Sequence, residues 1–403
     1  MTAEAAVLNK NGIALAADSA IVFGEGKDRR IYHSEEKIYN LSSKHSVGIM
    51  NYGSGGFMYI DWELIFIEFN NSLGDRVPYT LEDYVHEFLK FLQGFGDIDE
   101  FYQKGYLENT VRDVFKEFKN NYKLKFSRLL KRENLTESQK TNFLKRYLRI
   151  WRKQIEKERD ISLYEDDVLV KKYQKNIVDI FTNMFSDFVI DDALKEEAIK
   201  IIGLLFSKMQ ISRWGNYDSG IVFAGYGSRE LFPSVIHFSI AGKFNDKIYH
   251  TKPVKTDLLQ ESKFWIGTYA QTDVMQTFIS GMDPYFEKII FGQIERLCRG
   301  INKLAGKQYR EEIEELKDNF KDKIRNHGDD NYLFPLKKML ASLPVNNLAE
   351  IAEALVTLTS LRRHMSTDQE TVGGPTDVAL ITKAEGFVWV KRKMLNRMLT
   401  GQR

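Results

Sequence analysis

Four residues near the start of the chain have the types that amide hydrolysis requires: Thr2, Asp18, Lys37 and Gly53. An N-terminal threonine supplies a hydroxyl nucleophile and, in its own α-amine, a general base with an ordinary pKa of about 7.7 to 8.0. A lysine ammonium beside it would keep that amine neutral, because a like charge disfavours the protonated form. A carboxylate must hold the lysine, and a backbone N–H must bind the oxyanion. This set predicts attack by a hydroxyl on an amide carbonyl.

The chemistry requires a free amine on Thr2. Threonine is small enough in second place for a methionine aminopeptidase to remove Met1. The opening residues lack the basic start and long apolar stretch of a secretory signal. We therefore expect the mature chain to begin at Thr2.

The local pattern brings these residues toward one another. Residues 2–9 and 13–18 are short and apolar, and Asn11-Gly12 between them is typical of a type I′ hairpin turn. The hairpin predicts that Asp18 returns beside Thr2. Residues 37–41 and 46–50 indicate a second strand pair, which begins at Lys37 and is followed by the glycines from Gly53 onward.

The remaining chain alternates strand-rich and helical stretches. We expect helices over 57–71 and from residue 81, the latter capped by Thr80 with Asp83 three residues on. Strands are predicted at 219–227, 233–244 and 264–269, and a final pair at 377–383 and 386–393. Helical patterns fill the segments from about 100 to 195 and from 271 to 362. This order is typical of an α+β fold.

The ordered motifs resemble catalytic β subunits of the proteasome, which are N-terminal nucleophile hydrolases. Those subunits begin with threonine, and Asp18 follows Thr2 by the family's interval of 16 positions in the segment LAAD. Lys37-Ile38-Tyr39 is similar to their lysine-led strand, and Gly53 to the glycine that follows a short strand. Later segments, GIVFAGYG and VGGPTDVALITK, resemble their central strand and their closing strands.

The resemblance implies a four-layer αββα sandwich and a threonine peptidase or amidase that acts on peptides or proteins. It implies that Thr2 is the nucleophile and base, Lys37 tunes both, Asp18 orients Lys37 and the Gly53 N–H binds the oxyanion. The family's subunits are much shorter, so we predict one domain over 2–403 with helical insertions at 100–195 and 285–345. The chain would be a divergent, bacterial-type member, and a homo-oligomer is compatible with this family.

Composition excludes several other classes of protein. The net charge is only +2, and one cysteine, Cys298, excludes an internal disulfide and a multi-cysteine zinc site. The histidines show no metal-binding spacing, so neither a metal nor another cofactor is expected. No apolar stretch reaches the length of a membrane span. We expect a cytoplasmic protein.

Residues 104–160 are locally basic, with aromatic residues interleaved. We favour an interpretation in which the basic side chains cover one helix face while the aromatics pack inward. The alternative is a surface for an acidic protein or, less favoured, for nucleic acid.

A second function stays open for the whole chain. The supporting serines of the proteasome subunits have no counterpart in the segments IGTYAQTD and DQETVGG. The chain could therefore be a catalytically silent scaffold whose helical insertions bind a partner protein or nucleic acid. Retention of Thr2, Asp18 and Lys37 together argues for the enzyme.

Overall fold

The computed structural model shows a mixed fold of antiparallel sheets and helices, as the sequence predicts. Its chain divides into two compact units, each formed by segments far apart in the sequence. Unit 1 comprises Met1–Gly48, Ala224–Val235 and Thr256–Arg403, and unit 2 comprises Ile49–Phe223 and Ile236–Lys255. The structure describes residues 3–23, 30–32, 36–96, 98–130, 136–157, 167–208, 218–258, 264–305, 309–365 and 373–393.

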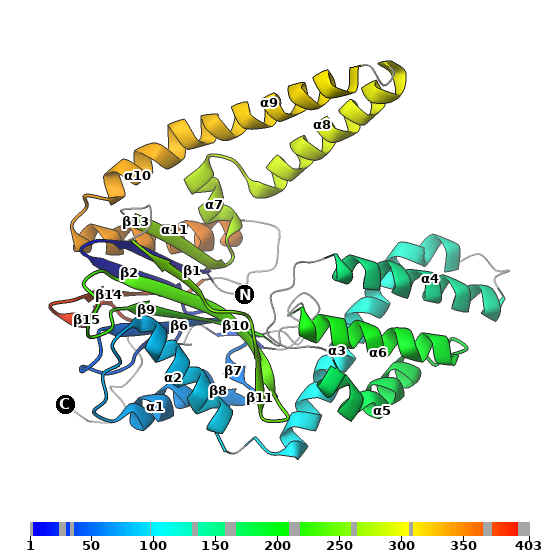
Figure 1. The fold of residues 1–403 in the computed structure, drawn as a ribbon, viewed down its shortest axis with the longest axis horizontal. Helices are drawn as coiled ribbons and strands as arrows, with labels where there is room; N and C mark the ends of the chain where they lie inside the picture. Colours follow the sequence, from blue (N-terminus) through cyan, green and yellow to red (C-terminus); the bar gives the residue numbers. More distant parts are fainter. Residues whose placement is uncertain are drawn as a thin grey trace. The chain divides into compact units, whose positions relative to one another are not determined.

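Unit 1 is built on a five-stranded antiparallel sheet in the order β13-β1-β2-β14-β15 (Figure 1). The N-terminal hairpin lies in its middle, between strands from the last third of the chain. This arrangement places Thr376, the first residue of β14, opposite Asp18, the last residue of β2. The strands are β1 Ala3–Asn9, β2 Gly12–Asp18, β13 Phe264–Ala270, β14 Thr376–Thr382 and β15 Gly386–Lys391.

Helix α11, Val345–His364, packs across β1, β2 and β14 of this sheet. Small side chains allow the close approach, because the strands present alanines to the helix and the helix returns alanines of its own. The main members of the shared core are Ala3, Ala5, Ala14, Ala16, Leu348, Ala349, Ala352, Leu355 and Val356.

The turn that joins β1 to β2 differs from the predicted type I′. Lys10 and Asn11 are its central residues, and neither has a positive φ. The Asn11 N–H instead donates to Asn9 Oδ1 at 2.8 Å, so a side chain closes the turn. Gly12 is the first strand residue, and a Cβ there would lie 2.6 Å from Val345 Cγ2 and 2.8 Å from Ile381 O. The glycine therefore serves packing under α11.

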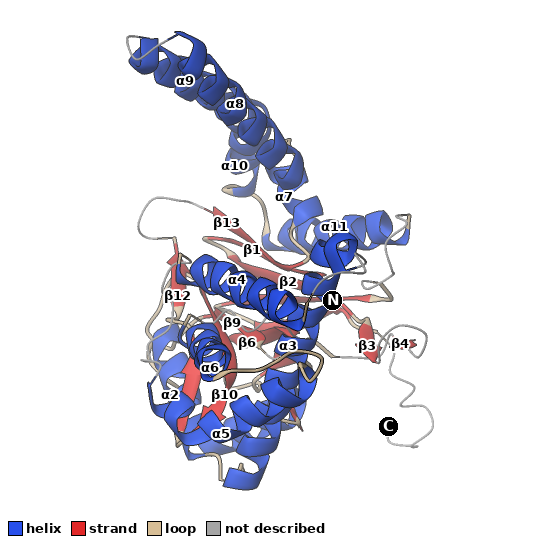
Figure 2. Cartoon of the chain, turned by 90° about the vertical axis from the view of Figure 1, so that its right-hand side faces the viewer, coloured by secondary structure: helices blue, strands red, loops and turns tan. Residues whose placement is uncertain are grey.

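Two antiparallel helices, α8 (Pro284–Ala305) and α9 (Arg310–Gly328), lie side by side in unit 1 (Figures 1 and 2). A short π-helix, Asp329–Leu333, joins α9 to α10, Phe334–Leu340. Helix α7, Asp273–Ser280, lies between the sheet strand β13 and α8 in the chain. Shorter strands complete this unit: β3 Ile21–Phe23, β4 Arg30–Tyr32 and β5 Ile38–Asn40.

The second sheet has the order β11-β10-β9-β6-β5, and β12 pairs with β10. Within unit 2, helices α1 and α2 pack on it through aromatic rings: Phe88 lies 5.1 Å from Phe69 and 5.3 Å from Phe223, between ring centroids. Besides β5, the strands are β6 Val47–Gly53, β9 Ser219–Gly225, β10 Ser234–Phe244, β11 Lys247–His250 and β12 Val254–Asp257. The two helices are α1 Trp62–Leu73 and α2 Leu81–Gly94.

The capping box at Thr80 and Asp83 forms as predicted. The helix expected over 57–71 begins later, at Trp62. Gly56–Phe57 (β7) and Ile60–Asp61 (β8) pair as a small hairpin, and the Asp61 side chain then caps α1 by accepting from the Glu63 N–H. Apolar density alone could not reveal this hairpin.

A bundle of long helices follows in unit 2 (Figure 1). Contacts between aromatic rings hold it together. Phe118 stacks on Trp151 at 4.6 Å, and Phe181 lies 5.1 Å from Phe115. That 100–195 and 285–345 are insertions into a single 2–403 domain stays a prediction. The bundle consists of α3 Glu100–Leu130, α4 Glu137–Glu156, α5 Asp167–Met184 and α6 Asp192–Ser207.

Among the described residues, every helix is too short or too polar to cross a lipid bilayer.

We predict that Gly12→Ala lowers the free energy of unfolding by about 1 to 3 kcal/mol, because the added methyl group overpacks the contact with α11. The measurement is urea unfolding. Gly292→Ala on α8 is the control, since a Cβ there meets nothing within 4 Å. It should leave stability unchanged or raise it by up to about 1 kcal/mol. Equal stability of Gly12→Ala and the wild type would contradict the packing role.

Candidate active site

A buried ion pair joins Asp18 to Lys37. The Lys37 Nζ lies 2.9 Å from Asp18 Oδ1, and the two residues are only 2% and 1% exposed. Asp18 ends β2, and Lys37 stands directly before β5. The structure therefore brings these two residues together, whereas their catalytic roles stay predictions.

Asp18 uses both of its carboxylate oxygens. Besides Lys37, Oδ1 accepts from the Ala3 N–H at 3.0 Å, and Oδ2 accepts from the Gly373 N–H at 2.9 Å. Lys37 Nζ also donates to the Ala20 carbonyl at 2.6 Å. These bonds compensate for the loss of water around two buried charges.

The bond from Ala3 matters because of its place in the chain. The Ala3 nitrogen belongs to the peptide bond that Ala3 forms with Thr2. Asp18 therefore fixes the orientation of that peptide next to a lysine ammonium. Thr2 itself lies outside the described residues, so its side chain and amine have no position here.

The residues just before β14 also contact Asp18 and Ser19. Ser19 Oγ donates to the Pro375 carbonyl at 2.9 Å, and Gly374 has φ +79°, which favours glycine. Sequence reasoning did not assign Gly373 or Pro375 to the site. The Gly-Gly-Pro run was the available signal, but its partner could only be found from the sheet register.

A second buried ion pair involves Asp377, the residue that follows Thr376 on β14. Asp377 Oδ2 is 2.8 Å from Lys393 Nζ, and Asp377 Oδ1 accepts from the Lys393 N–H at 2.7 Å. This pair fixes the chain after β15 to the strand that flanks Asp18.

Gly53 belongs to unit 2 and is the last residue of β6. Its φ is +89°, and a Cβ would lie 2.5 Å from the Asp218 carbonyl oxygen. That carbonyl accepts from the Ser54 N–H at 3.1 Å. The position therefore requires glycine, whereas the role of its N–H in binding an oxyanion stays a prediction.

The ion pair between Asp18 and Lys37 places a fixed positive charge close to the start of β1. A fixed ammonium group favours the deprotonated form of any nearby amine or hydroxyl. Its carboxylate partner holds the ammonium and the start of β1 in one register, so the charge cannot turn away. Among the described residues, no group of three or more His, Cys, Asp or Glu side chains is placed to hold a metal.

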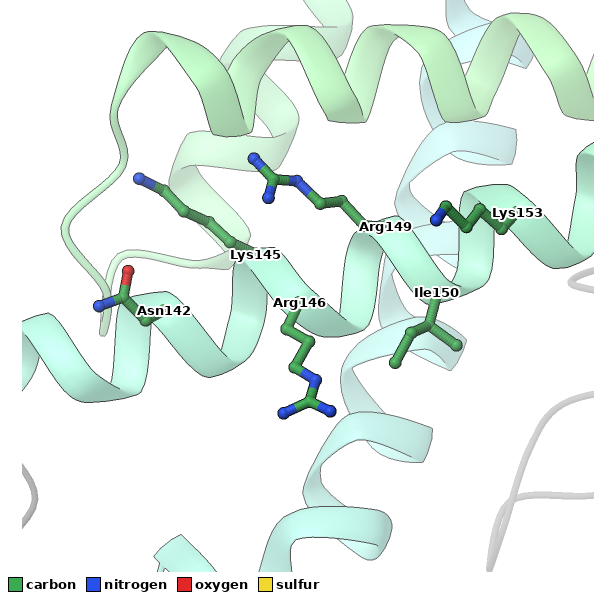
Figure 3. Close-up of a pocket in the computed structure, with 6 residues that line it drawn as sticks. All are labelled: Asn142, Lys145, Arg146, Arg149, Ile150 and Lys153. Atoms are coloured by element: carbon green, nitrogen blue, oxygen red, sulfur yellow. The ribbon is translucent and has the colours of Figure 1, made fainter.

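The basic segment has its aromatic residues inside, as favoured from the sequence: Phe118, Tyr122 and Trp151 are all buried. The exposed side of α4 forms a shallow basic pocket (Figure 3). Lys145 there pairs with Asp191, and Arg149 lies 3.8 Å from Glu197 on α6. The pocket is lined by Asn142, Lys145, Arg146, Arg149, Ile150 and Lys153.

Comparison with known proteins does not identify a family for this chain. No protein-family model matches the sequence. No curated protein matches it either. Among solved structures, the chain is similar to the Anbu (Gly-1) mutant from Hyphomicrobium sp. strain MC1, with 9% identity and a TM-score of 0.29 over 98% of this chain and 86% of that one. A likeness this weak shows neither a shared site nor a shared activity.

We predict that Lys37→Met lowers the free energy of unfolding by about 3 to 5 kcal/mol, because it leaves the Asp18 carboxylate buried without its cation. Adding Asp18→Asn to Lys37→Met should recover part of that loss, since the uncompensated charge is gone. The measurement is a double-mutant cycle in urea.

Lys200→Met is the matched control. Lys200 lies 3.8 Å from Glu196 on the exposed surface of α6, and its loss should cost less than about 0.5 kcal/mol. Additive effects of Lys37→Met and Asp18→Asn would show that the two buried residues do not depend on each other.

Proposed function

We propose that the protein is a threonine-type hydrolase of peptide or amide bonds, with Thr2 as its nucleophile after removal of Met1. One observation carries the proposal. Asp18 binds both the Lys37 ammonium and the N–H of the peptide that follows Thr2. The lysine is thus held beside the start of β1 by a carboxylate that also binds the Ala3 N–H.

In the proposed reaction, Thr2 Oγ attacks the substrate carbonyl carbon and passes its proton to the Thr2 amine. The positive charge of Lys37 keeps that amine neutral and stabilises the attacking oxygen. The Gly53 N–H donates to the oxyanion. Collapse of the intermediate breaks the C–N bond, and the leaving amine takes the proton from the Thr2 ammonium. Water then hydrolyses the ester and restores Thr2.

Lys37 is proposed to tune this reaction rather than to transfer the proton. Its ammonium already donates to Asp18 and to the Ala20 carbonyl, at 2.9 and 2.6 Å. Both bonds use N–H donors of the ammonium group and hold it in one place, which suits an electrostatic role. The α-amine of Thr2 is left as the proton acceptor.

The proposal extends to the architecture. Two antiparallel sheets with helices are compatible with the four-layer αββα sandwich of N-terminal nucleophile hydrolases. The position of the N-terminal hairpin in the centre of its sheet supports it, since β1 then has neighbours on both sides.

Incubation with a peptide epoxyketone tests this function. Formation of the adduct needs both a threonine hydroxyl and a free α-amine on one residue. We expect a mass increase on Thr2 in the wild type and loss of peptide hydrolysis by at least about a hundredfold in Thr2→Ala.

Thr2→Ser is the control, because serine keeps a hydroxyl and an α-amine and should retain labelling and part of the activity. Undiminished hydrolysis by Thr2→Ala would rule the enzyme out. Absence of any adduct, with the Asp18–Lys37 coupling intact, would favour the catalytically silent scaffold.

A further inference from the structure

Four cationic side chains line one pocket on the α8–α9 hairpin. Arg296, Arg299 and Lys303 belong to α8, and Arg310 is the first residue of α9. All four residues are exposed. The pocket has a volume of about 670 Å³, which is in the range of sites for small ligands. We call it the hairpin pocket.

The three cations on α8 form one stripe. They follow one another at intervals of three and four residues, so they lie on one side of the helix within about 10 Å along its axis. Gly300 lies between them and also lines the pocket, and a Cβ there would meet nothing within 4 Å. The stripe is therefore open to a ligand along its length.

The nearest carboxylates of the hairpin bind other cations. Glu314, which also lines the pocket, pairs with Lys317 on α9. The Glu295 carboxylate pairs with Lys321 at 3.0 Å, while its backbone carbonyl accepts from Arg299 Nε at 3.2 Å. Among the described residues, none of the four cations of the hairpin pocket has an ion-pair partner. The pocket thus keeps a net positive charge.

Asn302 adds a polar group to the same pocket. Its Oδ1 atom is buried and has no hydrogen-bond partner within the described part of the chain. A buried polar group without a partner is unusual in a folded protein. A flip of the amide group exchanges the oxygen for the NH₂ group, which can donate to an anion. A ligand rich in hydrogen-bond acceptors would therefore satisfy Asn302 as well as the cations.

The two helices are held against each other in the hairpin (Figures 1 and 2). Lys321 Nζ lies 5.6 Å from the centroid of the Phe291 ring on α8, and the Arg325 guanidinium lies 5.5 Å from the same centroid. At the base of the hairpin, Asp283 lies 3.5 Å from Arg362 on α11. A site on helices fixed in this way loses little conformational freedom when a ligand binds.

We infer that the hairpin pocket binds a short chain of phosphate groups, of the size of a triphosphate. Three of its four cations are arginines, and the arginine guanidinium presents a fork of N–H donors that matches phosphate oxygens. Several cations in one pocket suit a ligand with several adjacent negative charges. The described lining includes no apolar side chain, so the phosphate groups are recognised rather than an attached base or acyl chain.

Acidic residues on α9 limit the length of the ligand. Glu311, Glu312 and Glu315 are exposed on the first turns of α9, close in sequence to Arg310. They would repel a long polyanion, such as nucleic acid, that continued past the pocket along α9. A compact anion bound by the stripe on α8 and by Arg310 avoids this repulsion.

This inference does not depend on the proposed hydrolase. The hairpin pocket contains none of the residues assigned to that reaction, so a catalytically silent chain would bind the same ligand.

Isothermal titration calorimetry of the full chain with inorganic tripolyphosphate, at about 0.15 M salt, tests the site. We expect binding to the wild type. Arg299→Gln/Lys303→Gln should raise the dissociation constant about tenfold or more, because it removes two charge-assisted contacts. Far-ultraviolet circular dichroism checks that the helices persist in this variant.

Arg146→Gln/Lys153→Gln is the matched control, since it removes the same charge from the basic pocket on α4 (Figure 3). Its dissociation constant should stay within about twofold of the wild type, because salt screens distant charges. An equal loss of affinity in this control would show attraction to general surface charge only and would overturn the inference. A wild type that does not bind millimolar tripolyphosphate would overturn it as well.

A comparison of ligands identifies the source of the phosphate chain. Orthophosphate should bind at least about tenfold more weakly than tripolyphosphate, since it makes fewer contacts. Equal affinity for ATP and tripolyphosphate would support recognition of the phosphate chain alone, and tighter binding of tripolyphosphate would assign the pocket to the inorganic form. Binding of ATP without binding of tripolyphosphate, or tighter binding of a single-stranded oligonucleotide, would contradict the proposed ligand.

Discussion

A buried carboxylate cannot stay charged without partners, and Asp18 satisfies this constraint with three parts of the chain. It binds the lysine before β5, the first described amide of β1 and the amide of Gly373. Burial of the pair removes water from both charges, and these bonds replace the lost contacts with water. The position of the start of β1 is therefore tied to this charge compensation.

The surrounding sheet makes this compensation feasible. β1 and β2 lie between β13 and β14, so the residues at the Asp18 end of the hairpin are flanked by strands from the last third of the chain. Alanines on the strands and on α11 bring the helix close enough to exclude solvent from that end. At the other end of the hairpin, Gly12 has no side chain and so lets α11 lie equally close to the strands.

Sequence patterns predicted the parts of the fold that local chemistry determines. The apolar hairpin, the Thr80 capping box and the closing strand pair all appear, because apolar runs and caps act over a few residues. The turn at Lys10-Asn11 was wrong in type, since Asn9 closes it with its side chain. The start of α1 was wrong by five residues, since a two-residue strand pair replaces the first helical turn.

At the site, the required chemistry and the family resemblance predicted that Asp18 holds Lys37, but neither could find Gly373, which is distant in sequence and contributes only a backbone N–H. The exposed apolar residues of the α8–α9 hairpin were equally hidden, because an apolar helical stripe does not show whether anything covers it. Their exposure follows only from the packing of the two helices.

The central claim is that Asp18 and Lys37 hold a free threonine terminus ready for reaction, and the intact mass of protein purified from its native cells tests it most directly. The account predicts a mature chain that begins at Thr2 with an unmodified amine. A mature chain that keeps Met1, or that carries an acetylated Thr2, would contradict it, because the nitrogen of residue 2 would then be an amide that cannot accept the proton.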